Sequence, residues 1–325
     1  VLIDPLSVAN GMAIPFSTHP RMVLWATPPG ASSAIGTYHD WTDLLLLHED
    51  VHLVHLLRPS RNRWERWFSR FVGFGPLSLD APRWLTEGYA TMLEGRLTGV
   101  GRPNGDFRAA VLRARARAGR LPSYGALGAT GEGWQEGSMA YLAGSAFLEW
   151  LEHDAGRDAL PALWRRMSAR ERRDFDDAFE GVFGDSPARM YDRFVAEVTW
   201  RAMEVERAIG DDAREGTTVL DRSGATGAPA LSPDGERVAI DVGEPGESRV
   251  LAVYDLEPDE DAEAARREQV EKLLRLDPDD VPAVEPTVRP RKERHTLPTR
   301  NGAAPYAPRF LPSGESILFL SLIHI

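Results

Sequence analysis

The sequence predicts an α+β protein, in which a mainly helical domain with a small N-terminal β-sheet precedes a region of short β-strands. Three observations lead to this fold class. Apolar residues recur at helical spacing from Trp41 to about Ile209. A short β-favouring run lies before that segment, and short strands divided by turn sequences follow it from Gly216 onward. The change of pattern predicts two domains, over residues 1–212 and 216–325.

Composition and charge exclude several classes of function. The 325 residues contain 38 Lys and Arg, 49 Asp and Glu and no Cys, for a formal net charge of −11. Without Cys the chain has no disulfide, thiolate zinc site or cysteine nucleophile. The acidic balance argues against nucleic acid as a partner, and no apolar run reaches the roughly 18 residues of a membrane span. The chain begins without Met and ends in an apolar run, so we expect it to be a piece of a longer protein.

The first predicted element is a strand at Met22–Thr27. Its residues are apolar and β-favouring, and Pro28-Pro29-Gly30 closes it. Asn10-Gly11-Met12-Ala13 lies just before it and could shape its edge.

Helices fill the segment after this strand. The first predicted helix contains Leu44–His55. A later helix is capped by Asp80 and ends at Gly95. A long helix starts at about Glu136 and ends before Gly156.

Four aromatic residues share one face of another predicted helix, at the spacing i, i+3, i+4 and i+7: Trp64, Trp67, Phe68 and Phe71. Such a stripe could be a membrane-surface or substrate patch. The same spacing is more often the buried side of a helix, and we predict that these residues belong to the core.

Two related turn sequences organise the second region. Ser232-Pro233-Asp234-Gly235 places a turn before an apolar strand, and Pro312-Ser313-Gly314 repeats part of that pattern about 80 residues later. An acidic insertion at about residues 257–285 separates them and reads as a solvated helix or tail-like excursion.

The segment that carries chemistry is His48-Glu49-Asp50-Val51-His52, an HExxH motif in a helical apolar context. Residues i and i+4 lie one above the other on a helix, so both imidazoles project from one face and can reach one zinc ion. Glu49 sits one step round the helix, where a carboxylate can take the proton from a zinc-bound water. Two His on a helix also arise from ordinary packing.

A second segment supplies a third ligand. Glu87 lies 35 positions after His52, flanked by the small residues Gly88 and Ala90, which we expect to let two helices approach closely. A zinc ion held by His48, His52 and Glu87 keeps a fourth position for water, as catalytic rather than structural zinc sites do.

These paired motifs resemble those of the gluzincin metallopeptidases of the peptidase MA clan. Their HExxH and WLxEGxA sequences stand here as His48–His52 and Trp84–Ala90, and the resemblance covers about residues 8–200. It implies a zincin-like fold, zinc ligands His48, His52 and Glu87, and Glu49 as general base. In this class an exposed edge strand above the motif helix binds an extended peptide, which would be the role of Met22–Thr27. The alternative is a plain sheet strand without substrate contact.

The resemblance also implies an oxyanion-stabilising Tyr or His from a later helix. Tyr141 is best placed by its order in the chain, and Tyr124 and His153 compete with it. A core tyrosine is an equally good reading of Tyr141.

Three further residues near the motif have weaker roles: His55, Glu94 and Asp43. We expect His55 to pack or to support the ligands rather than to bind metal. Glu94 and Asp43 could orient a ligating imidazole, or could be plain surface acids.

The turn repeats resemble the strand pairs of a TolB-like β-propeller. Ser232–Gly235 matches that pattern fully and Pro312–Gly314 only in part, so the resemblance implies a truncated propeller over residues 216–325. The order of the two regions resembles that of a bacterial family of secreted or periplasmic proteins, which implies such a location and a possible protein partner for the propeller.

The sequence therefore predicts a zinc-dependent peptidase that acts on a peptide or protein substrate. The alternative is a propeller-based binding or scaffold protein whose peptidase-like domain has no turnover.

Overall fold

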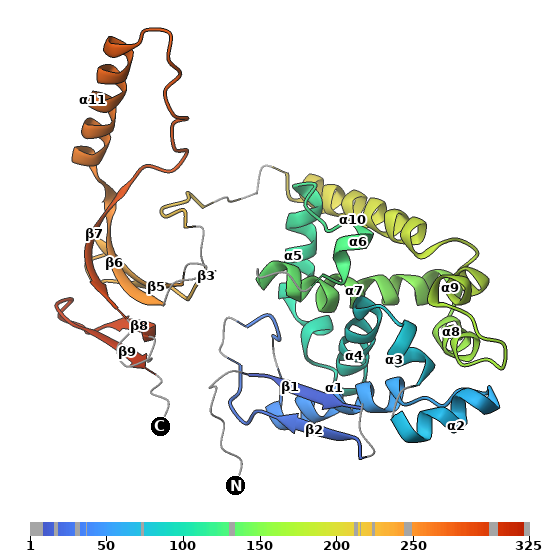
Figure 1. Ribbon diagram of the computed structural model, residues 1–325. Coiled ribbons are helices and arrows are strands. Elements are labelled where there is room, and N and C mark those ends of the chain that lie inside the picture. Colours follow the sequence, from blue (N-terminus) through green and yellow to red (C-terminus); the bar gives the residue numbers. More distant parts are fainter. Residues whose placement is uncertain are drawn as a thin grey trace. The chain divides into compact units, whose positions relative to one another are not determined.

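The computed structural model describes residues 9–15, 19–29, 33–36, 38–72, 75–129, 134–210, 214, 216–222, 225–243, 249–298 and 305–321. The chain divides into two compact units, Val1–Ala213 and Arg214–Ile325, and each is described by itself (Figure 1). The first is mainly helical, and the second consists of small antiparallel sheets and one helix; within the described ranges the strands close no barrel. No described helix is long and apolar enough to cross a membrane.

Two short antiparallel strands open the first unit: β1 (Gly11–Ile14) and β2 (Arg21–Leu24). The ladder continues for one more pair, because the Trp25 N–H donates to the Asn10 carbonyl at 3.0 Å. The predicted strand at residues 22–27 is therefore shorter than expected at its C-terminal end. Beyond it, the Trp25 carbonyl accepts a hydrogen bond from the indole Nε1 of Trp41 at 2.9 Å, which joins the sheet to the first turn of the next helix.

Ten α-helices and one 3-10 turn follow in the described part of this unit. They are α1 (Trp41–Leu56), α2 (Arg63–Val72), α3 (Pro76–Asp80), α4 (Arg83–Thr98), η1 (Arg102–Asn104), α5 (Asp106–Arg117), α6 (Tyr124–Leu127), α7 (Trp134–Ala155), α8 (Ala159–Met167), α9 (Phe175–Phe183) and α10 (Pro187–Ile209). The long helix before Gly156 is confirmed as α7, and Gly156 takes a left-handed φ of 90°.

Two predicted helix boundaries were wrong. α4 passes through Gly95 and ends before Gly99, whose φ of 74° makes it the C-terminal cap. Gly95 lies inside the helix. This position requires a glycine because a Cβ there would lie 2.6 Å from the Pro103 side chain. Asp80 ends α3, and Pro82 holds the N-cap position of α4.

The core of the first unit lies where α4 and α7 pack side by side (Figure 1). Gly88 and Gly144 form their closest approach, since a Cβ on Gly88 would come within 2.6 Å of the Gly144 carbonyl carbon. Large side chains from α8, α9 and α10 complete this core around Trp84, Phe147 and Tyr191. Gly88 thus brings α4 against α7, not against the motif helix as expected.

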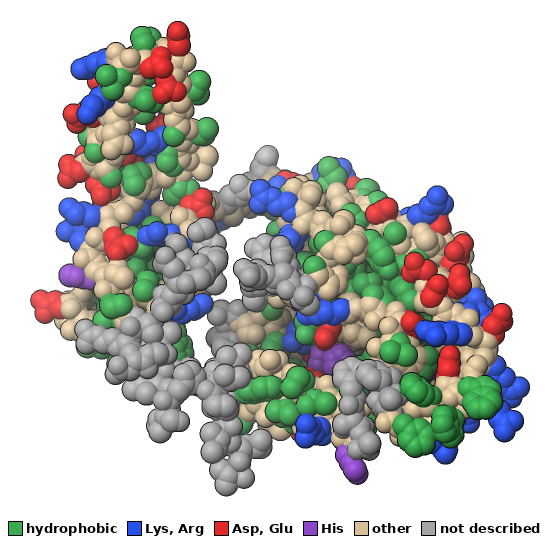
Figure 2. Space-filling view, in the orientation of Figure 1, with side chains coloured by type: hydrophobic (Ala, Val, Ile, Leu, Met, Phe, Trp, Pro, Cys, Tyr) green, Lys and Arg blue, Asp and Glu red, His purple; other side chains and the backbone are tan. Residues whose placement is uncertain are grey.

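The aromatic stripe of α2 is exposed, so the prediction that it belongs to the core was wrong. The side chains of Trp64, Trp67, Phe68 and Phe71 all lie on the surface, where Figure 2 shows hydrophobic and basic groups together over α2. Helical periodicity marks an apolar face but does not say what that face contacts.

The second unit contains a five-stranded antiparallel sheet and a separate hairpin. The sheet consists of β3 (Ala225–Thr226), β4 (Ala230–Leu231), β5 (Arg237–Gly243), β6 (Val250–Pro258) and β7 (Arg291–Leu297), and the hairpin of β8 (Pro305–Phe310) and β9 (Ile317–Ser321). The path through the sheet is β3-β5-β6-β7, with β4 paired to β5. Both predicted turns connect antiparallel strands, with Gly235 at φ 76° and Gly314 at φ 72°.

The hairpin packs on one face of the sheet. Phe310, Ile317 and Phe319 contact a buried cluster formed by Ala239, Leu251 and Val253. The acidic insertion forms α11 (Glu260–Leu276), capped by Asp259 and without a buried residue, which agrees with the predicted solvated helix (Figure 1).

Candidate metal centre

α1 presents His48, Glu49 and His52, all of which are buried. Asp40 is the N-cap of the helix, and its side chain accepts from the Asp43 N–H at 3.0 Å and so satisfies one free donor of the first turn. An apolar cluster that includes Trp41, Leu44 and Leu45 packs one turn before the motif, and these side chains line the same cavity as the motif residues. This packing holds α1 where His48 and His52 face Glu87 of α4.

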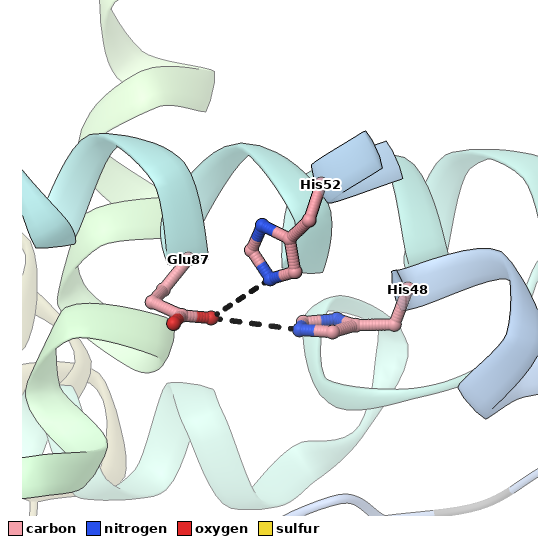
Figure 3. A group of neighbouring side chains, drawn as sticks. All are labelled: His48, His52 and Glu87. Atoms are coloured by element: carbon pink, nitrogen blue, oxygen red, sulfur yellow. Dashed lines mark ion pairs between the residues drawn. The ribbon is translucent and has the colours of Figure 1, made fainter. Parts of the chain in front are cut away.

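Glu87 of α4 meets the two imidazoles. Its Oε2 atom lies 3.2 Å from Nε2 of His52 and 3.6 Å from Nε2 of His48 (Figure 3). One ligand atom from each of the three residues lies within 4.8 Å of the others, so this group could hold a metal ion.

Two properties of the group fit a metal ion. Glu87 Oε2 is buried and makes no hydrogen bond within the described structure, which costs free energy unless a cation or proton satisfies it. Bonds of about 2.0–2.1 Å in a tetrahedral arrangement place ligand atoms roughly 3.3 Å apart, and both carboxylate–imidazole distances lie near that value.

Glu94 holds the other side of His48. Its Oε2 lies 3.2 Å from Nδ1 of His48 and 2.6 Å from a guanidinium nitrogen of Arg102, and its Oε1 accepts from the Arg102 backbone N–H at 2.9 Å. Gly101 permits this arrangement, because a Cβ there would lie 2.5 Å from Glu94 Oε1. Burial raises the pKa of Glu94, whereas Arg102 and His48 lower it. The lowering effects are the larger, so the net pKa lies below its usual range. A carboxylate that stays ionised here fixes Nδ1 as the protonated nitrogen and turns Nε2 toward Glu87.

The protein without metal carries a strong charge pair at this site. Burial lowers the pKa of His48, but Glu87 and Glu94 outweigh burial and raise it from 6.5 to about 9. Burial raises the pKa of Glu87, and the two imidazoles reverse this, so the net pKa lies below its usual value. A proton therefore occupies the position where a cation would bind, and a metal ion has to displace it.

Glu49 lies beside the three possible ligands and touches β1. Burial and the nearby Glu87 raise its pKa, His48 and His52 lower it, and the net pKa lies above its usual value. Its carboxylate accepts a hydrogen bond from the Ala13 backbone N–H. Gly11 leaves the space for this contact, since a Cβ there would lie 2.7 Å from Glu49 Oε1. A buried carboxylate with a raised pKa suits proton transfer near neutral pH.

The site opens into a cavity of about 230 Å³. Its polar lining includes His48, Glu49, His52, Glu87, Glu94, Arg102 and Tyr141, and its other walls come from β1 and the apolar part of α1. This volume admits a side chain or a short stretch of peptide rather than a folded domain.

Tyr141 of α7 lies over His48, with their ring centroids 6.0 Å apart and nearly parallel. The guanidinium groups of Arg83 and Arg102 lie 5.3 and 5.0 Å from the centre of its ring. Burial and Glu87 raise the pKa of Tyr141 to about 12, against the lowering effect of the two arginines. The phenol is therefore a protonated hydrogen-bond donor at neutral pH.

The other candidates lie outside the cavity. Tyr124 packs against Trp84 and Tyr191 in the core, and His153 lines a separate groove between α7 and α10. Asp43 is exposed on α1.

His55 is buried between the rings of Trp164 and Tyr89, and neither of its ring nitrogens has a hydrogen-bond partner within the described structure. Burial lowers its pKa from 6.5 to about 3, so the ring is neutral.

Sequence reasoning missed Arg102 and Arg83. For the strand at Met22–Thr27 it left two readings open, an edge that binds substrate and a plain sheet strand, and the second agrees with the cavity lining. β1, not the strand at Met22–Thr27, lines the cavity and contacts Glu49. The pair Gly101-Arg102 after a helix is a weak signal, but the buried Glu94 could have prompted a search for a basic partner.

No protein-family model, curated protein or solved structure matches this chain.

Proposed function

We propose that the first unit is a zinc-dependent peptidase of the gluzincin type. The observation that carries this proposal is the meeting of His48, His52 and Glu87 beside the buried carboxylate of Glu49 in one cavity. Two imidazoles and one carboxylate suit zinc, and a site with three protein ligands leaves a place for water.

When zinc is bound, it supplies a polarised water and a Lewis acid for the carbonyl of the substrate. Glu49 accepts the proton of that water and donates it to the amine that leaves. Tyr141 donates a hydrogen bond to the oxygen on which negative charge develops. Glu94 and Arg102 keep His48 oriented throughout.

Among the described residues, β1 pairs only with β2, and its other edge supports a peptide as the substrate. Asn10 and Trp25 form a hydrogen-bonded pair, so Gly11 and Ala13 direct their backbone groups away from β2. The hydrogen bond from Ala13 to Glu49 places that edge beside the general base. An extended peptide that pairs with this edge runs past the metal site.

We propose in addition that the second unit is part of a TolB-like β-propeller. The packing of the β8–β9 hairpin on the face of the larger sheet supports this, because propeller blades pack face to face. The matching turns at Gly235 and Gly314 add to that support.

Glu49→Gln tests the peptidase proposal. The variant is expected to bind one zinc per chain by elemental analysis and to lose cleavage of a mixed peptide library. Asp43→Asn, an exposed acid on the same helix, is the matched control and is expected to cleave as the parent does. A Glu49→Gln protein that cleaves at the parent rate contradicts the mechanism, and equimolar zinc without any cleavage by the parent favours the scaffold alternative.

A further inference from the structure

Helix α2 presents an unusual aromatic face. The exposed fractions are 81% for Trp64, 57% for Trp67, 60% for Phe68 and 64% for Phe71. At about 100° per residue these four positions fall within an arc of roughly 100°. The rings of Trp67 and Phe71 contact each other edge to face, with centroids 5.1 Å apart. The four exposed side chains therefore share one side of the helix.

Basic side chains border this aromatic face. Arg63 and Arg70 are exposed and lie on one flank of it by helical position. The one acid of the helix, Glu65, lies on the opposite side, where the Ser60 hydroxyl donates to it at 2.7 Å. α2 therefore carries a local positive charge in a chain whose net charge is −11.

The neighbouring segment extends the basic border. The Asn62 side chain donates to the Arg170 carbonyl at 2.9 Å, and a guanidinium nitrogen of Arg61 donates to the Arg165 carbonyl at 2.7 Å. These bonds fix the start of α2 to the end of α8 and bring the exposed Arg170 beside it. The fixed end holds the aromatic face outward.

We propose that α2 docks the protein on an anionic lipid surface. An amphipathic helix with Trp and Phe on one side and Arg at the border lies in the plane of a membrane interface, with its rings among the acyl chains and its guanidinium groups among the phosphates. The charge decides between possible occupants. A second copy joined through the same face would bring two basic borders together, which repel, whereas anionic headgroups neutralise them.

This docking site is separate from the metal centre and does not depend on the peptidase proposal. The helix lies after the end of α1, and none of its residues lines the metal-site cavity. A peptidase held in this way would act on chains close to the lipid surface.

The test is co-sedimentation of the full chain with vesicles of phosphatidylcholine alone or mixed with phosphatidylglycerol. The parent is expected to bind the mixed vesicles, and Trp64→Ala/Trp67→Ala is expected to lower that affinity by about tenfold or more. Arg63→Glu/Arg70→Glu is expected to lower it as well and to remove most of its salt dependence. All four positions are exposed, so both variants are expected to fold as the parent does.

Trp200→Ala is the matched control, because Trp200 is also exposed, at 59%, but lies on α10 away from any such aromatic stripe. It is expected to bind vesicles as the parent does. The proposal is overturned if the parent does not bind mixed vesicles, if it binds both kinds equally, or if Trp64→Ala/Trp67→Ala binds as well as Trp200→Ala. A different outcome would assign the face to a second copy. In that case the parent binds no vesicles and is a dimer by light scattering, and the Trp64→Ala/Trp67→Ala variant is a monomer.

Discussion

Nδ1 of His48 lies 3.2 Å from Oε2 of Glu94, and both residues are buried. This contact determines which nitrogen of His48 faces Glu87, because an ionised carboxylate accepts and does not donate. Arg102 keeps the carboxylate ionised from its other side. Glu94 and Arg102 thus support the candidate metal centre without supplying a ligand to it.

Glu94→Gln is expected to lower zinc affinity by about 10–100-fold, since the amide accepts a weaker hydrogen bond from His48 and leaves Arg102 without a charge partner. Competition with a zinc chelator measures this affinity. Glu152→Gln is the control, because Glu152 pairs with Arg96 outside the metal site. Equal zinc affinity in Glu94→Gln and the parent would show that Glu94 does not position His48.

Tyr141→Phe is expected to lower kcat by about 10²–10³-fold with zinc content unchanged, because it removes one donor to the developing oxyanion. Tyr124→Phe is the control, since Tyr124 lies in the core outside the cavity. Steady-state kinetics on a cleavable peptide measure both. An unchanged kcat in Tyr141→Phe would leave the tyrosine as a packing residue.

The metal-free protein is expected to lose stability as the pH rises from about 6.5 to about 9. The folded-state pKa of His48, about 9, exceeds its ordinary value of 6.5, so the folded state binds more protons within that window. The charge pair contributes fully to the free energy of unfolding below pH 6.5, and this contribution is lost above about pH 9. Urea unfolding across this range measures it.

Zinc is expected to remove that pH dependence, because a metal-bound imidazole has no proton at Nε2 to lose. His48→Gln without metal is expected to show a flatter profile than the parent. A metal-free parent whose stability stays constant or increases between these pH values would contradict the charge pair.

Gly88→Ala is expected to destabilise the fold by about 1–3 kcal/mol, since its Cβ would meet the Gly144 backbone at 2.6 Å and push α4 from α7. Gly137→Ala on α7 is the control, because a Cβ there meets nothing within 4 Å. The control is expected to be neutral or to stabilise by up to about 1 kcal/mol through helix propensity. Urea unfolding of both variants measures the difference, and equal midpoints would show that α4 and α7 can separate at no cost.

Local spacing predicted much of the centre but little of what surrounds it. The i, i+4 spacing of His48 and His52 is enough to place both rings on one face, and the second motif identified Glu87. The part played by Arg102 depends on how the chain turns after Gly99, and the role of β1 depends on packing between segments distant in sequence. Neither has a local pattern that fixes it.

Two wrong predictions have a common physical reason. Gly95 was taken as a helix end and the α2 stripe as core, because composition along one element does not reveal its neighbours. Gly95 is small to fit Pro103, and the aromatic residues of α2 face outward. Both outcomes are decided by tertiary packing.

The hydrogen bond from the Trp41 indole to the Trp25 carbonyl couples β2 to the first turn of α1. Through its pairing with β1, the same ladder continues to Ala13 and its bond to Glu49. The sheet is thus connected to α1 at two places, through Trp25 and through Ala13, so the strands and the helix are expected to move together. A peptide aligned by that edge would keep its distance from Glu49 through thermal motion.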